Sequence, residues 1–119
     1  MRTSFDKIKK SGQAWMASLD NSSYSKAWAG AAITMHSCIS QADFEKEMQD
    51  IRAPWGKVQS REIKSQRHLT RLPGLPNGDY WVISYTTTFE NKPNVAESVV
   101  IALEQDGHWR VAGYTLPDV

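Results

Sequence analysis

The apolar residues of this chain change their spacing once, near Trp55-Gly56. Before that point they recur every three or four residues, which is typical of amphipathic helices. After it, apolar and polar residues alternate, and Asn77-Gly78 and Asp106-Gly107 mark turns, as in strands joined by hairpins. Because the helices and the strands each need another layer to bury their apolar faces, the sequence predicts an α+β fold with helices packed on a sheet.

We expect a single α+β domain over residues 1–119, with three N-terminal helices on a curved four-stranded antiparallel meander. Ser40 is expected to cap the third helix, together with Asp43. Gly56 is expected to stop that helix. The predicted helices span about 4–20, 22–36 and 40–54, and the predicted strands span about 58–70, 79–90, 95–105 and 108–116.

Composition narrows the classes of function. The formal charge of +1 gives no bulk attraction to nucleic acid or to a membrane surface. The single cysteine, Cys38, excludes an internal disulfide and a zinc site of several cysteines, and we expect it to be buried. No apolar run is long enough for a membrane span, and the basic N-terminus lacks the apolar stretch of a signal peptide.

The last two strands are apolar on both faces. Alternation places Val99, Ile101 and Leu103 on one face and Val100 and Ala102 on the other. In the final strand it places Trp109 and Val111 opposite Tyr114. One face packs on the helices, so we expect a second copy of the chain to cover the outer face in a homodimer.

Residues 52–71 carry a local excess of positive charge, with one acid, Glu62. The six basic residues are Arg52, Lys57, Arg61, Lys64, Arg67 and Arg71. Binding of nucleic acid or of another anion is one interpretation. Protection of an edge strand by charge is the other, and we favour it because no aromatic residues are interleaved for base stacking.

The sequence offers no catalytic set and no metal site. His36, His68 and His108 do not share metal-ligand spacing. The strand positions expected to face the helices hold no Asp, Glu or His, and His36 and Cys38 point to different helix faces. We therefore predict no catalytic residue, no metal and no cofactor.

Several stretches together resemble an uncharacterised bacterial family, domain of unknown function 4019. They run in order along nearly the whole chain: Ala14-Trp15, Leu19-Asp20, Tyr24, Ala27-Trp28, Trp55-Gly56, Ser60-Arg61, Leu72-Pro73-Gly74, Pro76-Asn77-Gly78-Asp79-Tyr80, Thr88-Phe89, Glu97, and Asp106-Gly107-His108-Trp109-Arg110-Val111-Ala112-Gly113-Tyr114. The element order is similar to the cone-shaped nuclear-transport-factor-2-like fold, a relative of the cystatin-like layout. The resemblance implies a periplasmic or secreted location but no activity; a chain that is the full native product would be cytoplasmic.

Within these motifs Arg61, Glu97 and Arg110 are the charged positions. They either form a cross-strand pair that fixes register or line the open end of a cone. We predict that the chain is a non-catalytic module that binds a small apolar or anionic ligand or a protein partner. The alternatives are a small isomerase or dehydratase and, with less support, nucleic-acid binding through residues 52–71. The candidate ligand-binding residues are Arg61, Tyr85, Trp109, Arg110 and Tyr114.

Overall fold

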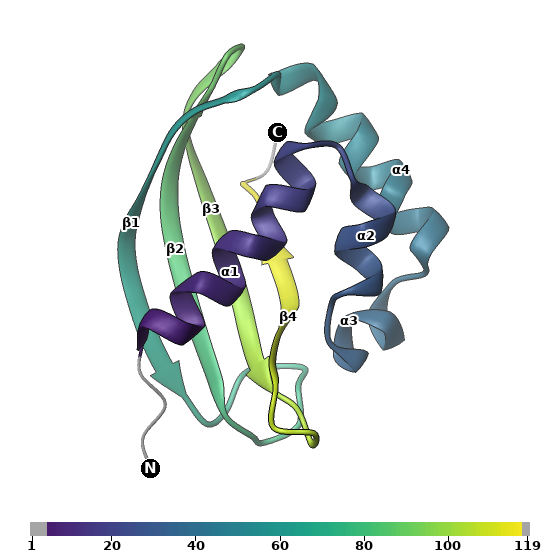
Figure 1. Ribbon diagram of the computed structural model, residues 1–119, viewed down its shortest axis with the longest axis vertical. Coiled ribbons are helices and arrows are strands. Elements are labelled where there is room, and N and C mark those ends of the chain that lie inside the picture. The colour runs from purple at the N-terminus through teal and green to yellow at the C-terminus, as the bar shows by residue number, and fades with distance from the viewer. Residues whose placement is uncertain (1–4, 118–119) are drawn as a thin grey trace.

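The computed structural model describes residues 5–117 and confirms a block of helices followed by a sheet (Figure 1). The helices are α1 (Phe5–Asp20), α2 (Tyr24–Ala29), α3 (Ile33–Cys38) and α4 (Gln41–Ile51), followed by the short 3-10 helix η1 (Ala53–Trp55). The strands are β1 (Val58–Leu69), β2 (Tyr80–Phe89), β3 (Lys92–Leu103) and β4 (Trp109–Thr115). None of these helices is both long and apolar enough to cross a membrane.

The second predicted helix is two helices, so the expectation of three helices was wrong. The chain leaves helical geometry after Ala29, and Ala32 adopts an extended conformation before α3 begins. Its N–H donates to the carbonyl of Val111 on β4 at 2.8 Å. This bond joins the link between α2 and α3 to the edge of the sheet, and such a tertiary contact is invisible in the periodicity of the segment.

The four strands form one antiparallel sheet in the order β1-β2-β3-β4, which confirms the predicted meander. β1 is therefore an edge strand, as its charged residues indicated. The helices gather on one face of the curved sheet, and α1 runs across its strands (Figure 1). Burial follows this layering: along β2 Ile83, Tyr85, Thr87 and Phe89 are buried, and the residues between them are half-buried.

The core lies between α1 and the middle strands. Ile8 and Met16 on α1 and Ile83, Val99 and Ile101 on the sheet have no exposed surface. Gly12 lets α1 approach closely, because a Cβ at this position would lie 3.2 Å from both the Ile101 side chain and the Tyr85 hydroxyl. The apolar spacing read from the sequence therefore identified the face of α1 that packs on the sheet.

Gly56 forms the turn between the helical block and the sheet. It has a φ of +79°, which L-residues with a side chain rarely adopt. A Cβ there would lie 2.7 Å from Oε1 of Glu90, and this same oxygen accepts a hydrogen bond from the N–H of Lys57 at 3.0 Å. The change of period noticed in the sequence coincides with a backbone position that only glycine fits.

A bulge on β4 overturns the predicted facing of Tyr114. Val100 pairs with Gly113 and Ile101 pairs with Val111, so Ala112 is an extra residue on β4. Strict alternation fails at this point. Tyr114 consequently packs against the same core as Val111, where alternation had placed it on the opposite face.

The outer face is less apolar than the sequence indicated. Leu72 and Leu75, in the loop between β1 and β2, pack against the cluster that contains Val100 and Ala102. Leu103, predicted to share the buried stripe, is 40% exposed because it ends β3 beside a groove described below. The homodimer stays a prediction, and the loop removes part of the exposed apolar surface on which it rested.

Candidate functional site

Six elements contribute one side chain each to a polar cluster at the junction of helices and sheet. We call this cluster the junction network. Its members come from the ends of α1 and α4 and from all four strands, and three of them, Arg52, Thr87 and Glu97, are buried. In chain order they are Asp20, Arg52, Arg61, Thr87, Glu97 and Tyr114.

Asp20 at the end of α1 binds both arginines. Nη1 and Nη2 of Arg61 donate to its two oxygens at 2.9 and 3.1 Å, a two-pronged contact. Arg52, which follows α4 and is 4% exposed, donates through Nη2 at 2.8 Å. Forked arginine–carboxylate pairs fix orientation as well as charge, so this cluster sets the angle of α1 against β1.

Glu97 is the deepest acid of the cluster, with no exposed surface. Nε of Arg61 donates to its Oε1 at 3.0 Å, across β2. The Thr87 hydroxyl also donates to Oε1, and the Tyr114 hydroxyl donates to Oε2. The expectation that no carboxylate faces the helices was therefore wrong. Of the two arrangements left open for Arg61, Glu97 and Arg110, an ion pair forms between Arg61 and Glu97, although their strands are not neighbours.

The surroundings shift the pKa values of the cluster. Partial burial alone would raise the pKa of Asp20, but the hydrogen bonds from Arg61 and Arg52 outweigh it and lower that pKa. Burial raises the pKa of Tyr114, and the negative charge of Glu97 raises it further. For Arg61, burial opposes the charged form, yet Asp20 and Glu97 keep its pKa above the ordinary value. Asp20 is thus held ionised and Arg61 protonated, beside a neutral Tyr114.

A cavity of about 400 Å³ adjoins this cluster between α1 and the first two strands. We call it the α1 cavity. Its lining residues are Lys9, Gln13, Arg61, Ile63 and Tyr85. Two of these carry a positive charge and none carries a negative charge. Arg61 has two N–H groups left after its bonds to Asp20, Thr87 and Glu97.

Tyr85 is 3% exposed, and its hydroxyl has no hydrogen-bond partner among the described residues. Burial raises the pKa of Tyr85 to about 12, so the hydroxyl is a neutral donor at physiological pH. Native folds seldom bury a hydroxyl without a partner, because its desolvation is then uncompensated. An unpartnered donor beside Lys9 and the spare N–H groups of Arg61 is a feature of an anion-binding site.

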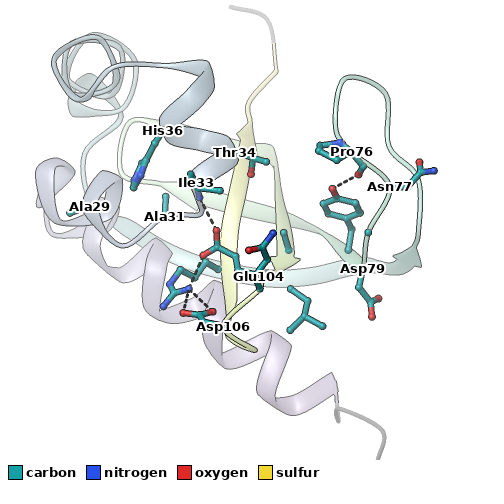
Figure 2. Close-up of a pocket in the computed structure, with 16 residues that line it drawn as sticks. Ala29, Ala31, Ile33, Thr34, His36, Pro76, Asn77, Asp79, Glu104 and Asp106 are labelled. Atoms are coloured by element: carbon teal, nitrogen blue, oxygen red, sulfur yellow. Dashed lines mark hydrogen bonds and ion pairs between the residues drawn. The ribbon is translucent and has the colours of Figure 1, made fainter.

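A second concavity lies at the other end of the sheet (Figure 2). This groove measures about 670 Å³ and lies between α3 and the loop that carries Pro76. Its remaining boundary is the β3–β4 turn, where Arg110 pairs with Glu104 and Asp106. The turn itself is the predicted Asp106-Gly107 hairpin, with Gly107 at a φ of +85°.

The structure divides the predicted ligand-binding residues. It brings Arg61, Tyr85 and Tyr114 together at the junction network and the α1 cavity. Arg110 lies apart from them and borders the groove. Trp109 is buried in the core and lines neither space. The three aromatic candidates Tyr85, Trp109 and Tyr114 therefore do not line one of these two spaces together.

The structure also bears on the expectations for Cys38, for a metal site and for the basic segment 52–71. Cys38, expected to be buried, is exposed at the end of α3. Among residues 5–117 no three His, Cys, Asp or Glu side chains come together in a manner that could hold a metal ion. Two of the six basic residues of the 52–71 segment, Arg52 and Arg61, form ion pairs within the protein. The segment therefore has fewer unpaired positive charges than its sequence indicated.

Sequence reasoning missed Asp20, Arg52 and Glu97 as members of one site, and it missed Lys9 and Gln13 as cavity residues. A signal for Glu97 existed. It lies two residues from both Val95 and Val99, so alternation puts it on the buried face. No sequence signal pairs Asp20 with Arg52, because they meet only once α1 and α4 have packed.

These features define a class of protein in which helices cover one face of an antiparallel meander and are joined to it by a partly buried network of two arginines and two carboxylates. The chain belongs to the family described as "Protein of unknown function (DUF4019)", whose model matches residues 11–114. All six residues of the junction network lie within that span. Comparisons with curated proteins and with solved structures found no match. The family resemblance is confirmed, and the nuclear-transport-factor-2-like and cystatin-like descriptions of the fold stay predictions.

Proposed function

We propose that this protein binds a small anionic molecule in the α1 cavity and does not change it chemically. The observation that carries the proposal is the buried Tyr85 hydroxyl, which lacks a partner where Lys9 and Arg61 border the same space. A carboxylate or phosphate oxygen would accept from the remaining N–H groups of Arg61, and from the Tyr85 hydroxyl once ligand entry uncovers it. Ile63 would contact an apolar part of the ligand.

The absence of a usable base favours binding over catalysis. Among residues 5–117, no acid and no histidine line the α1 cavity. The nearest buried carboxylate, Glu97, is held by three donors and has no exposed surface. A general base must reach the proton that it abstracts, so an isomerase or dehydratase would have to dismantle the junction network first.

The proposal is tested by titrating the isotopically labelled protein with acetate, succinate and inorganic phosphate and following the amide signals by NMR. We expect shifts at Gln13, Arg61 and Ile63. Tyr85→Phe loses no hydrogen bond within the protein, so it should fold normally and bind the anion about tenfold more weakly. Lys9→Gln should weaken binding similarly.

Lys10→Gln is the matched control, because it removes one positive charge from the same helix outside the α1 cavity. It should leave the affinity nearly unchanged at constant ionic strength. Equal weakening by Lys9→Gln and Lys10→Gln would mean non-specific attraction to α1 and would count against a built site. Full affinity in Tyr85→Phe would remove the observation on which the proposal rests.

A further inference from the structure

The groove of Figure 2 has the dimensions of a ligand site and is separate from the α1 cavity. Its volume of about 670 Å³ falls within the usual range for pockets that take small molecules. It borders Tyr80 at the start of β2, whereas Thr87 of the junction network lies seven residues further along the same strand. The two concavities have no lining residue in common.

Exposed apolar side chains converge on this groove. Among the described residues Ile33 is 70% exposed and Leu103 is 40% exposed, and these are the large hydrophobic residues that the fold leaves in solvent. Both border the groove, although one comes from α3 and the other from the end of β3. Single exposed apolar residues are ordinary, but two that meet at one concavity from distant segments are typical of a binding site.

The walls of the groove are held in place before any ligand arrives. On one side, the Tyr80 hydroxyl donates to the carbonyl of Pro76, as the dashed line in Figure 2 shows, and the N–H of Gly78 donates to Thr70 at 3.0 Å. On the other, the N–H of Ile33 donates to Glu104 at 2.8 Å. A preformed site loses less conformational entropy on binding, which favours affinity.

The polar lining is negative. Asp79, Glu104 and Asp106 border the groove, together with Arg110 and the imidazole of His36, and Asp79 is bonded to the ring of His68. Nη1 of Arg110 lies 2.7 Å from Glu104 and 2.9 Å from Asp106, so one positive charge is shared by two carboxylates. Hydrogen bonds from the His108 backbone and from Arg110 lower the pKa of Asp106, which keeps it ionised.

A buried polar group lies beneath the α3 wall. The hydroxyl oxygen of Thr34 is buried and has no partner among the described residues. Figure 2 places Thr34 across the groove from Pro76. This oxygen has almost no accessible surface, so a ligand in the groove does not reach it in this conformation.

We propose that this groove binds a small organic cation, an apolar body that carries a protonated amine. The apolar body lies against Ile33 and Leu103, and the amine faces Glu104 and Asp106. This site is distinct from the proposed anion site in position and in the sign of its charge, so neither proposal depends on the other.

Three probes of nearly equal size separate the contributions of charge and apolar contact: 2-phenylethylammonium, 2-phenylethanol and phenylacetate. Each is titrated into the labelled full chain and followed by NMR. We expect 2-phenylethylammonium to shift the amide signals of Ile33, Thr34 and Leu103 and to bind about tenfold tighter than the neutral alcohol. Phenylacetate should leave these signals in place.

Leu103→Lys should abolish binding of the amine, because it removes an apolar contact and adds a repelling charge. Ile33→Lys should do the same, and its site is the more exposed of the two. Ala96→Lys, at an exposed position on β3 outside the groove, is the matched control and should retain the affinity.

Equal shifts at the groove by the alcohol or by phenylacetate would overturn the assignment to a cation. No shift at the groove up to the solubility limit of the amine would overturn the site itself. If Ala96→Lys lost as much affinity as Leu103→Lys, the added positive charge alone would explain the loss. This result too would overturn the proposal. Shifts by phenylacetate confined to Gln13 and Ile63 would support two separate sites.

Discussion

A fully buried glutamate is the least expected residue of this protein. Taking a carboxylate out of water costs several kcal/mol unless it is paired, and the fold pairs Glu97 with Arg61 and with two hydroxyl groups. Removing one charge of such a pair destabilises the fold more than replacing both with apolar residues, because the remaining charge stays buried without a partner. Glu97 therefore stabilises the fold mainly by compensating Arg61.

From this we predict that Glu97→Gln lowers the free energy of unfolding by about 3 kcal/mol. Glutamine keeps the shape and one acceptor, so the loss measures the charge. Urea unfolding followed by circular dichroism checks the value. Glu62→Gln is the control: its partner Lys64 lies 3.0 Å away with both side chains largely exposed, so its effect should stay below about 1 kcal/mol. Equal effects from the two variants would contradict a buried ion pair.

At the scale of elements, the turn at Gly56 joins the helical segment, with its apolar period of three to four residues, to the strands, where residues alternate. The helical block ends when the N–H of Gly56 donates to Ala53, and the sheet begins with Lys57, whose N–H donates to Glu90. Asn91 closes the same corner by donating to the carbonyl of Trp55 at 2.9 Å. The β2–β3 turn thus packs on the end of the helical block, and Gly56 has no room for a side chain.

Gly56→Ala should lower the free energy of unfolding by about 3 kcal/mol, because alanine is strained at this positive φ and its Cβ clashes with Glu90. Gly74→Ala supplies the comparison. It has a similar φ of +80° but nothing within 4 Å of the added Cβ, so only the backbone strain of about 1 kcal/mol applies. Thermal and urea unfolding of both variants measure the difference. If Gly56→Ala were as mild as Gly74→Ala, the contact with Glu90 would not constrain the turn.

Features that depend on residues close together in the sequence, such as helix caps and tight turns, were predicted correctly. Ser40 accepts from the N–H of Asp43 at 3.1 Å, as its capping signal indicated, and the Asp106-Gly107 turn forms where it was expected. Elements decided by distant contacts were not. The division of the second helix depends on Ala32 reaching Val111, and the facing of Tyr114 depends on one extra residue in β4. Neither contact leaves a mark on local spacing.

For the whole molecule, the junction network couples the two layers. Its charges come from α1, α4, β1 and β3, and its hydroxyl groups from β2 and β4. The sequence could single out Arg61, Glu97 and Arg110 as charged positions within the family motifs and offer an arginine–glutamate pair as one alternative. It could not indicate the full set, since the partners are separated by up to 41 residues and meet only in the folded chain.

The same network should define the pH range of stability. The folded-state pKa of Asp20 is below its ordinary value of 3.8, so the folded chain releases this proton more readily than the unfolded chain. Its contribution is present above pH 3.8 and is lost as the pH falls through the folded pKa. The folded pKa values of Tyr114 and Tyr85 lie above the ordinary 10.0. Their contribution is present below pH 10.0 and is lost as the pH rises through the folded values.

We therefore expect a stability plateau between these limits, measured by urea unfolding at a series of pH values. Asp20→Asn should be less stable than the wild type on the plateau, and the gap should close below pH 3.8, where the wild type also loses this charge. Tyr114→Phe should show a shallower fall above pH 10.0, since it has one fewer raised hydroxyl to ionise on unfolding. If the stability difference between Asp20→Asn and the wild type stayed constant below pH 3.8, the ion pairs of Asp20 with Arg52 and Arg61 would not couple protonation to folding. In that case packing, and not the junction network, would hold α1 on the sheet.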